Sequence, residues 1–268
     1  MKQKVATTIS QLTRDKPAFM HFDLTGFIRL GTNAESCLIN INSMLNDVQS
    51  NGGNVLIPTY SYSYTSNELY SVRDSMSTLG HSSEFLREKN YSIRTYDPIF
   101  SYLSFASLTP NKHFTNTDSN TFGSGSIIDE VFQNDGYLIS VGDRLHYSTE
   151  IHYIERLLKV PYRFEKDFHG EIIGLDGVKK RQKATYYCRD LEFAKRHNMT
   201  VSFEKLVYDL KQEGYVESVT IDDMLLIEIV RFQDLLPFIK RKLEKDDFYL
   251  MKPNRRVSKN SLQLNSHT

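Results

Sequence analysis

The feature that most constrains this chain is a strand, a helix and a second strand within residues 18–58. The segment "AFMHFDL" predicts a short buried strand. Apolar residues then recur at spacings of three and four between Cys37 and Val48, which predicts a helix that ends at the Asn-Gly-Gly of residues 51–53. The segment "NVLIP" predicts a second buried strand. This order is typical of a βαβ unit, so we expect its two strands to run parallel to each other in a sheet.

The remaining apolar segments fit the same α/β class. The run "YLISVG" predicts another buried strand, "TEIHYIERLLK" a helix, and residues 202–213 a second helix. The 268 residues suffice for a sizeable core, and no linker divides them. We therefore expect a single domain over residues 1–252, a mixed sheet flanked by helices, and a polar, disordered tail over residues 253–268. Further strands are predicted near residues 171–174, 184–188 and 216–220.

Charge and composition exclude several classes of function. The 33 basic residues balance the 33 acidic residues, so no overall basic field favours nucleic acid or a membrane surface. Two cysteines are too few for a disulfide framework or a four-cysteine zinc site. No apolar run approaches the roughly 20 residues that span a bilayer, and the N-terminal segment has no secretory apolar region. We expect a cytoplasmic protein with no membrane insertion and no nucleic-acid partner.

A glycine-rich segment, "FGSGS" at residues 122–126, precedes a predicted amphipathic helix. Glycines allow a tight turn that exposes backbone N–H groups, and the N-terminus of a helix favours a phosphate. Capping of the helix by Ser126 is the alternative. Neither the dinucleotide-binding pattern nor the P-loop pattern is present, so phosphate contact and capping both stay open.

The segment "STEIHYIERLL", residues 148–158, places a histidine and two carboxylates on one predicted helix. If Ser148 or Thr149 caps this helix, His152 lies about one turn in, at the edge of an apolar stripe. Glu155 follows three residues later and can flank the imidazole. An imidazole with its ordinary pKa of about 6.5 can accept a proton near neutrality, and a carboxylate can fix its tautomer. A half-buried histidine with only local hydrogen bonds is the alternative.

A metal site is not indicated by these residues. His152 and Glu155 have the spacing H-x-x-E, but no ordered third ligand is evident, and the H-E-x-x-H pattern is absent. There is also no G-x-S-x-G nucleophile pattern. The hydroxyl-rich "TYSYSYT" of residues 59–65 follows the second predicted strand, where open α/β folds bind ligands. A polar edge strand is the alternative for that stretch, and a metal-dependent hydrolase stays open as a rival function.

Four segments, in one order, resemble the aminoglycoside 3-N-acetyltransferase family. The family pattern is similar to G-G-x-x-x-x-P-T-[FY], R-S-x-x-P-x-x-S, F-G-x-x-S, a strand ending in glycine, and T-x-x-H-x-x-E. The resemblance covers residues 15–160 and is weaker beyond them. It implies an acyl-CoA-dependent N-acyltransferase with a single α/β fold that differs from the GNAT fold. The matching segments are "GGNVLIPTYSYS" (52–63), "IRTYDPIFSYLSFA" (93–106), "FGSGSIIDEVFQNDGYLISVG" (122–142) and "STEIHYIE" (148–155).

The resemblance also implies roles for individual residues. His152 matches the general base, which takes a proton from the acceptor amine as the amine attacks the thioester carbonyl, without a covalent acyl-enzyme. Glu155 or the later Glu192 is expected to orient it. The co-substrate implied is acetyl-CoA or another acyl-CoA, with no metal. The residues expected to contact it are Thr59, Tyr60, Ser61, Gly123, Ser124, Gly125 and Ser126, and those expected at the acceptor are Arg94, Asp97 and Thr149.

The acceptor is expected to differ from that of the resistance enzymes in the family. Asp97 stands where those enzymes carry a histidine, and a neutral chain attracts a polycationic aminoglycoside only weakly. We expect a nucleotide-linked deoxyamino sugar made for a surface polysaccharide, whose negative charge would suit Arg94, Arg144 and Arg163. An antibiotic-resistance acetyltransferase, a non-catalytic binding module that keeps the fold, and a homodimer stay open.

Overall fold

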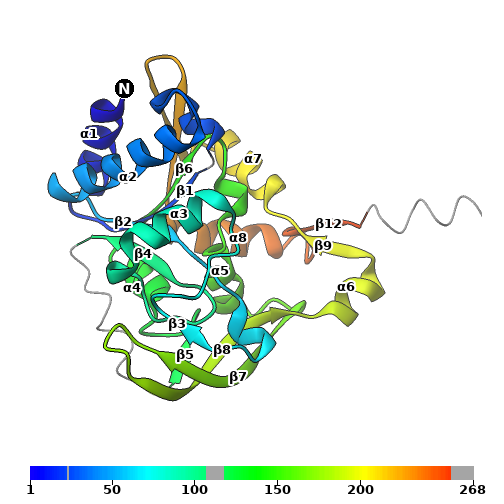
Figure 1. The fold of residues 1–268 in the computed structure, drawn as a ribbon. Helices are drawn as coiled ribbons and strands as arrows, with labels where there is room; N and C mark the ends of the chain where they lie inside the picture. The colour runs from blue at the N-terminus through cyan, green and yellow to red at the C-terminus, as the bar shows by residue number, and fades with distance from the viewer. Residues whose placement is uncertain (23, 107–117, 255–268) are drawn as a thin grey trace, which may run out of the picture.

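The computed structural model describes residues 1–22, 24–106 and 118–254. Its centre is a six-stranded mixed sheet, which confirms the predicted fold class (Figure 1). Three neighbouring strands of this sheet run parallel, and the three others are antiparallel to their neighbours. The strand order is β10 (Val216–Ile221), β11 (Leu225–Arg231), β6 (Tyr137–Val141), β1 (Ala18–Phe22), β2 (Val55–Pro58) and β4 (Tyr102–Phe105).

Alternating side chains of the central strands build a core on each face of the sheet. Ala18 and Met20 of β1 pack in one core with α1 (Lys2–Thr13) and α2 (Ala34–Ser50), whereas Phe19 belongs to the other core. Because strand residues alternate between faces, His21 lies on the same face as Phe19. That second face is covered by α4 (Ile127–Gln133), α5 (Ile151–Leu157), α7 (Glu204–Gln212) and α8 (Leu235–Leu243).

The predicted βαβ unit is present as β1, α2 and β2. Asn33 caps α2 by accepting a hydrogen bond from the Ser36 N–H at 2.8 Å. The apolar stripe that begins at Cys37 is buried, as the periodicity predicts. The helix N-terminal to this unit, α1, was not predicted from the sequence.

A second, four-stranded sheet lies at the bottom of Figure 1. Its two long strands, β7 (Arg163–Ile173) and β8 (Lys179–Arg189), pair along all 11 residues of each and extend well beyond the predicted segments. Many of their outer residues are charged and exposed, so they give no apolar signal. The other elements are β3 (Tyr70–Ser71), α3 (His81–Asn90), β5 (Asp118–Asn120), α6 (Leu191–His197) and the pair β9 (Met199–Val201) and β12 (Met251–Pro253).

Two predicted boundaries differ in the structure. Helix α5 begins at Ile151 with Glu150 as its N-cap residue, so neither Ser148 nor Thr149 caps it. Their carbonyls accept hydrogen bonds from Ile151 and His152, which makes residues 148–150 a tight turn before the helix. Pro253 pairs with Met199, so the folded chain continues past residue 252, and residues 255–268 of the predicted tail lie outside the described residues.

The hydroxyl-rich stretch after β2 is not an edge strand. Tyr60 and Tyr64 are buried in the core, and residues 63–66 form the 3-10 helix η2 (Ser63–Ser66). The alternation of tyrosine and serine in this stretch therefore comes from tyrosine rings that are buried in a turn, and it does not mark a β-strand. In the described ranges, no helix has the length and apolar character needed to cross a membrane.

Candidate active site

The parallel strands β6, β1 and β2 end at one edge of the central sheet. The chain passes from β1 to β2 on one side, and β6 lies on the other side of β1. Connections therefore diverge at the carboxyl end of β1, which is the position where open α/β folds bind ligands. Residues that follow these three strands line two neighbouring cavities at this edge.

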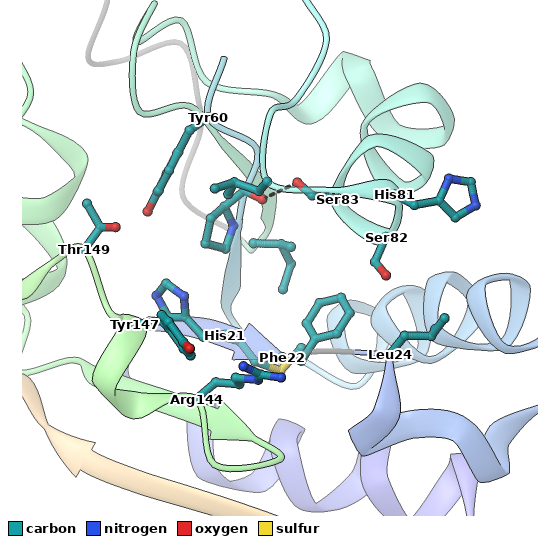
Figure 2. A pocket seen from close by; sticks show the side chains of 14 residues that line it. His21, Phe22, Leu24, Tyr60, His81, Ser82, Ser83, Arg144, Tyr147 and Thr149 are labelled. Carbon is teal, nitrogen blue, oxygen red and sulfur yellow. Dashed lines mark hydrogen bonds between the residues drawn. The ribbon is translucent and has the colours of Figure 1, made fainter. Parts of the chain in front are cut away.

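The first, which we call the strand-end cavity, has a volume of about 430 Å³ (Figure 2). Apolar side chains from the ends of β1 and β2 and from the loop before α3 form much of its wall, and the segment after β6 adds polar residues. Figure 2 shows the His21 ring inside the cavity, with Tyr60, Tyr147 and Thr149 around it. The apolar lining comprises Met20, Phe22, Leu24, Ile57, Pro58 and Leu79.

The second, which we call the histidine cavity, has a volume of about 460 Å³ and a more polar lining. Tyr147 and Thr149 line both cavities, so the turn before α5 is a wall that the two cavities share. His152 faces only the second of them. Apart from Tyr147 and Thr149, the charged and polar residues beside His152 in the lining are Tyr62, His146, Ser148, Arg163, Tyr186, Arg189, Ser202, Glu204 and Lys252.

His152 is held by a buried network from α5 and β7. Its Nδ1 lies 2.6 Å from Oε2 of Glu155, one helical turn away on α5. Glu155 is fully buried, and it also accepts a hydrogen bond at 3.0 Å from the Tyr162 hydroxyl and forms an ion pair at 2.7 Å with Arg163 Nε. Arg163 Nη2 lies 3.1 Å from His152 Nε2. Because a guanidinium can only donate, Nε2 is the unprotonated nitrogen and Nδ1–H points to Glu155.

Electrostatics keep this pair in a form suited to proton abstraction. Burial lowers the pKa of His152, and the charge of Arg163 lowers it further, against the opposing effect of Glu155. Burial on its own would raise the pKa of Glu155, but the neighbouring His152 and Arg163 outweigh it, and the net pKa is lowered. The site therefore presents a neutral imidazole beside an ionised carboxylate near neutral pH.

A second histidine–carboxylate pair, which the sequence did not indicate, lies beside the strand-end cavity. Glu150 is fully buried, and its Oε2 lies 2.8 Å from Nε2 of His21 on β1. Tyr102 donates a hydrogen bond to Glu150 Oε1 at 2.8 Å, and the Tyr60 hydroxyl lies 3.2 Å from the same oxygen. Glu150 directly precedes α5 and is two residues before His152, so the two histidine–glutamate pairs meet at the start of this helix.

The expected cofactor residues after β2 are only partly at a cavity. Tyr60 lines the strand-end cavity. Thr59 and Ser61 are buried behind it, where Thr59 O accepts from Arg94 and the Ser61 hydroxyl donates to Pro98 O at 3.0 Å. These two residues shape the backbone that positions Tyr60.

The glycine-rich segment lines neither of the two cavities. Ser126 caps α4 by accepting a hydrogen bond from the Asp129 N–H at 3.1 Å. Gly125 has a φ of +77°, which favours glycine, and its N–H donates to the Asp129 carboxylate at 2.7 Å. Ser126 is therefore the cap of α4, and the cofactor contacts expected for Gly123, Ser124, Gly125 and Ser126 stay a prediction.

The expected acceptor residues do not converge. Arg94 is fully buried and donates to backbone carbonyls of Thr59, Val72 and Ser75. Asp97 is buried and accepts from the Thr121 hydroxyl and from two backbone N–H groups, and burial raises its pKa. Only Thr149 among the three lines a cavity.

The two other predicted arginines lie in different cavities, and only one of the two predicted carboxylates contacts His152. Arg144 lines the strand-end cavity and Arg163 the histidine cavity, so the arginines predicted to meet a negative charge do not share one site. Glu192 is exposed on α6, whereas Glu155 contacts His152 directly. The described ranges hold no cluster of three or more His, Cys, Asp or Glu side chains arranged to bind a metal ion.

Comparison with known proteins identifies the family of this chain. The family model described as aminoglycoside 3-N-acetyltransferase matches residues 29–244, which is most of the chain. The chain belongs to the aminoglycoside 3-N-acetyltransferase family. It is accordingly an acyl-CoA-dependent N-acetyltransferase, with the acceptor still to be assigned. No curated protein sequence matches the chain.

Solved structures of this family share the fold. Aminoglycoside acetyltransferase AAC(3)-Xa has a TM-score of 0.66 and 15% identity, over 91% of this chain and 92% of that protein. AAC-IIIb in a binary complex with CoASH has a TM-score of 0.64 and 16% identity, over 91% and 96%. A histidine-to-alanine mutant of AAC(3)-IVa in complex with gentamicin has a TM-score of 0.60 and 17% identity, over 93% and 90%. At these identities the structural likeness supports the fold alone.

Proposed function

We propose that the chain transfers an acetyl or other short acyl group directly from an acyl-CoA to the amine of an amino sugar, with His152 as general base. The observation that carries this proposal is the pair formed by the half-buried His152 and the fully buried Glu155 at a cavity wall. Its Nδ1–H is fixed by Glu155 at 2.6 Å, so Nε2 keeps the lone pair that accepts a proton.

In the proposed reaction, the amine nitrogen attacks the thioester carbonyl carbon while His152 Nε2 removes an amine proton. The tetrahedral intermediate then expels the CoA thiolate, the C–S bond breaks, and the imidazolium returns the proton to sulfur. Arg163 Nη2 must give up its 3.1 Å contact with Nε2 when the amine arrives. Two side-by-side cavities would hold both substrates, which supplies the proximity that such a transfer needs.

We assign the acyl-CoA to the strand-end cavity. Its apolar walls suit the pantetheine arm, and its position at the divergence of β1, β2 and β6 is the usual ligand position of such sheets. The thioester would then lie at the wall formed by Tyr147 and Thr149, next to the histidine cavity. The relative crystallised with CoASH supports an acyl-CoA as co-substrate.

We assign the acceptor to the histidine cavity, and its charge favours an anionic amino sugar. Arg163 and Arg189 are directly opposite each other in the pairing of β7 with β8, and both line the cavity. Like charges in this position repel, and an anionic group between them would relieve the repulsion. Arg163 is paired with Glu155, so Arg189 supplies the excess charge. These observations support a nucleotide-linked deoxyamino sugar, made for a surface polysaccharide, as the acceptor.

An aminoglycoside is the second candidate, because family members are named for that substrate and one relative was crystallised with gentamicin. A polycation would meet Arg163, Arg189 and Lys252, of which only Lys252 is paired with the lining residue Glu204, at 2.7 Å. The balance of charge in the lining therefore favours the anionic acceptor.

A thiol-release assay with acetyl-CoA and a panel of amines tests both candidates. We expect a nucleotide-linked amino sugar to give a higher kcat/KM than kanamycin or gentamicin. Arg189→Gln should raise KM for the anionic acceptor about tenfold and leave KM for acetyl-CoA unchanged, because the two substrates occupy different cavities. A higher kcat/KM for the aminoglycosides would identify them as the acceptors, and absence of thiol release with every amine would contradict the enzymatic proposal.

A further inference from the structure

We propose that Tyr62 is a specificity-determining residue of the histidine cavity, whose aromatic ring lies against the sugar ring of the bound acceptor. The inference rests on the proposed function, because it requires the amino sugar to occupy this cavity. It assigns the recognition of the sugar to a different side of the cavity from the arginines that would meet an anionic group.

The first support is the backbone conformation of Tyr62. Its φ of +56° and ψ of 0° lie in the left-handed region, which is unfavourable for a bulky side chain. In the described ranges, six of the eight non-glycine residues with positive φ are asparagine or aspartate, and Tyr62 is the aromatic one. Tyr62 precedes η2, and Asn67, which follows η2 with a φ of +59°, has a side chain that suits this conformation. A tyrosine in this position has a conformational cost, which points to a use for its side chain.

Hydrogen bonds on both sides of Tyr62 hold this conformation. Its carbonyl oxygen accepts from the backbone N–H of Thr65 at 3.0 Å and from the Thr65 hydroxyl at 2.7 Å. The preceding Ser61 donates from its N–H to Ile99 O at 3.3 Å and from its hydroxyl to Pro98 O at 3.0 Å. The backbone that carries the Tyr62 ring is thus fixed before a ligand binds, which lowers the entropy cost of binding.

The second support is the position of the ring. Tyr62 lines the histidine cavity and is 36% exposed, and its ring packs edge-on against Phe100 with 5.3 Å between the centroids. Tyr186 lines the same cavity and packs on Phe100 at 5.0 Å. Because Phe100 is itself buried, it is a firm support for both tyrosine rings. This part of the cavity wall is therefore aromatic and preformed.

The other aromatic residues of the lining have different surroundings. Phe203 is buried and lies 5.4 Å from the His152 ring, so it supports the proposed base. Tyr147 belongs to the wall that the two cavities share, where the thioester is assigned. Tyr62 and Tyr186 line the histidine cavity and not the strand-end cavity. They can therefore contact the acceptor without contacting the acyl-CoA.

A sugar ring is the part of the acceptor that fits an aromatic wall. The phosphate groups of a nucleotide-linked sugar need cationic partners, which Arg163 and Arg189 supply. The C–H groups on the face of a pyranose ring are apolar, and covering them with a tyrosine ring is favourable. The amine is a substituent of that ring, so the ring enters the histidine cavity whenever the amine reaches His152.

Two acceptors that share one sugar separate this contact from contacts to the nucleotide. The probes are dTDP-viosamine, a nucleotide-linked amino-dideoxyhexose, and methyl viosaminide, the methyl glycoside of the same sugar. Glycine adopts the left-handed conformation without strain, so Tyr62→Gly removes the ring and keeps the backbone. In thiol release from acetyl-CoA, we expect KM to rise about eightfold for both probes, as for roughly 50 Å² of apolar surface left uncovered. The kcat values and the calorimetric Kd for CoA should stay within about twofold of wild type, because the ring contacts neither the reacting atoms nor CoA.

Three further variants complete the experiment. Tyr62→Phe keeps the ring and should leave KM for both probes within about twofold of wild type. Asn67→Gly is the matched control, because it places glycine at the second left-handed position beside η2, in an exposed residue that lines neither cavity, and it should behave as wild type. Tyr62→Asn, whose new side chain also tolerates positive φ, takes the place of Tyr62→Gly if that variant does not fold.

The outcomes separate this inference from the proposed function. An unchanged KM for both probes in the folded glycine or asparagine variant would show that the ring does not contact the sugar. A rise for dTDP-viosamine alone would place the contact at the nucleotide, and an equal rise in Tyr62→Phe would assign it to the hydroxyl; either result contradicts the inference. A parallel loss of CoA affinity would show that the ring has only a structural role. Absence of thiol release by the wild type with both probes would overturn the inference, and its absence with every amine would overturn the proposed function as well.

Discussion

The ion pair between Glu155 and Arg163 offers a quantitative test of the His152 network. Glu155 is fully buried and the Arg163 side chain is 2% exposed, with 2.7 Å between Oε2 and Nε. Glu155→Gln keeps one oxygen that can accept from either His152 Nδ1–H or the Tyr162 hydroxyl, but it removes the charge that compensates Arg163. Arg163→Met keeps an unbranched apolar stem and removes the cation. Each single variant therefore leaves one buried charge without its partner.

The magnitude follows from that uncompensated charge. Removing one partner of a buried ion pair costs about 3–5 kcal/mol, whereas removing both partners can be nearly neutral. We expect each single variant to lose about 3 kcal/mol or more of unfolding free energy, and the double variant to lose less than the sum of the two by about 2 kcal/mol or more. A domain with a stability of about 10 kcal/mol would remain folded after each of these losses.

Urea unfolding followed by circular dichroism, with linear extrapolation for the four proteins of the cycle, measures this coupling. Equal slopes of the unfolding free energy against urea concentration in the four proteins would show that their denatured states are comparable. Losses that add within about 0.5 kcal/mol would show that Glu155 and Arg163 are energetically independent, and would refute the argument that this pair holds His152.

Three other predictions concern individual residues. Because burial and Arg163 lower the pKa of His152, kcat/KM should fall only below a pH of about 6.5. Arg163→Met removes a positive charge and should therefore move this acidic limb to higher pH. An unchanged limb in the pH–rate profile of the variant would contradict the assignment of His152 as the titrating group. Ser126→Ala should cost about 1 kcal/mol in urea unfolding by removing the α4 cap, with the Kd for CoA unchanged by calorimetry; a weaker Kd would restore the cofactor role expected for the glycine-rich segment. Asp97→Ala should destabilise the fold by roughly 1–3 kcal/mol, because two backbone N–H groups and the Thr121 hydroxyl lose the carboxylate that accepts from them. The preference among acceptor amines should not change. An altered preference in the thiol-release assay would place Asp97 at the acceptor.

The parts of this fold that the sequence predicts are those with a local signal. The β1–α2–β2 unit follows from apolar periodicity and from the polar and glycine residues that end the helix. The contact of His152 with Glu155 follows from their spacing on one helix. Both signals lie within a few residues of the groups they describe, so they can be recognised in the sequence without knowledge of the tertiary fold.

The partners that come from distant segments could not be predicted in this way. Arg163 reaches His152 because the chain reverses after α5 and enters β7, and the charged, exposed outer halves of β7 and β8 give no strand signal. His21 and Glu150 are 129 residues apart, and they meet because β1 and β6 are neighbours in the sheet. Two sequence features together would have suggested this pair. One is a histidine at the end of a run of buried strand residues, and the other is the glutamate that follows the threonine of the T-x-x-H segment.

The central claim is that His152 is the base for acyl transfer to an amine, and single-variant kinetics test it most directly. Initial rates of thiol release from acetyl-CoA, with the best amino-sugar acceptor at saturation, should be compared for wild type, His152→Ala and His152→Gln. General-base catalysis typically contributes about 10²–10⁴-fold, so kcat should fall by that factor in both variants. Calorimetric Kd values for CoA should stay nearly unchanged, because the imidazole handles the proton of the amine. A folded His152→Ala protein that keeps more than about a third of wild-type kcat would contradict the account, since the loss of a base predicts a far larger decrease.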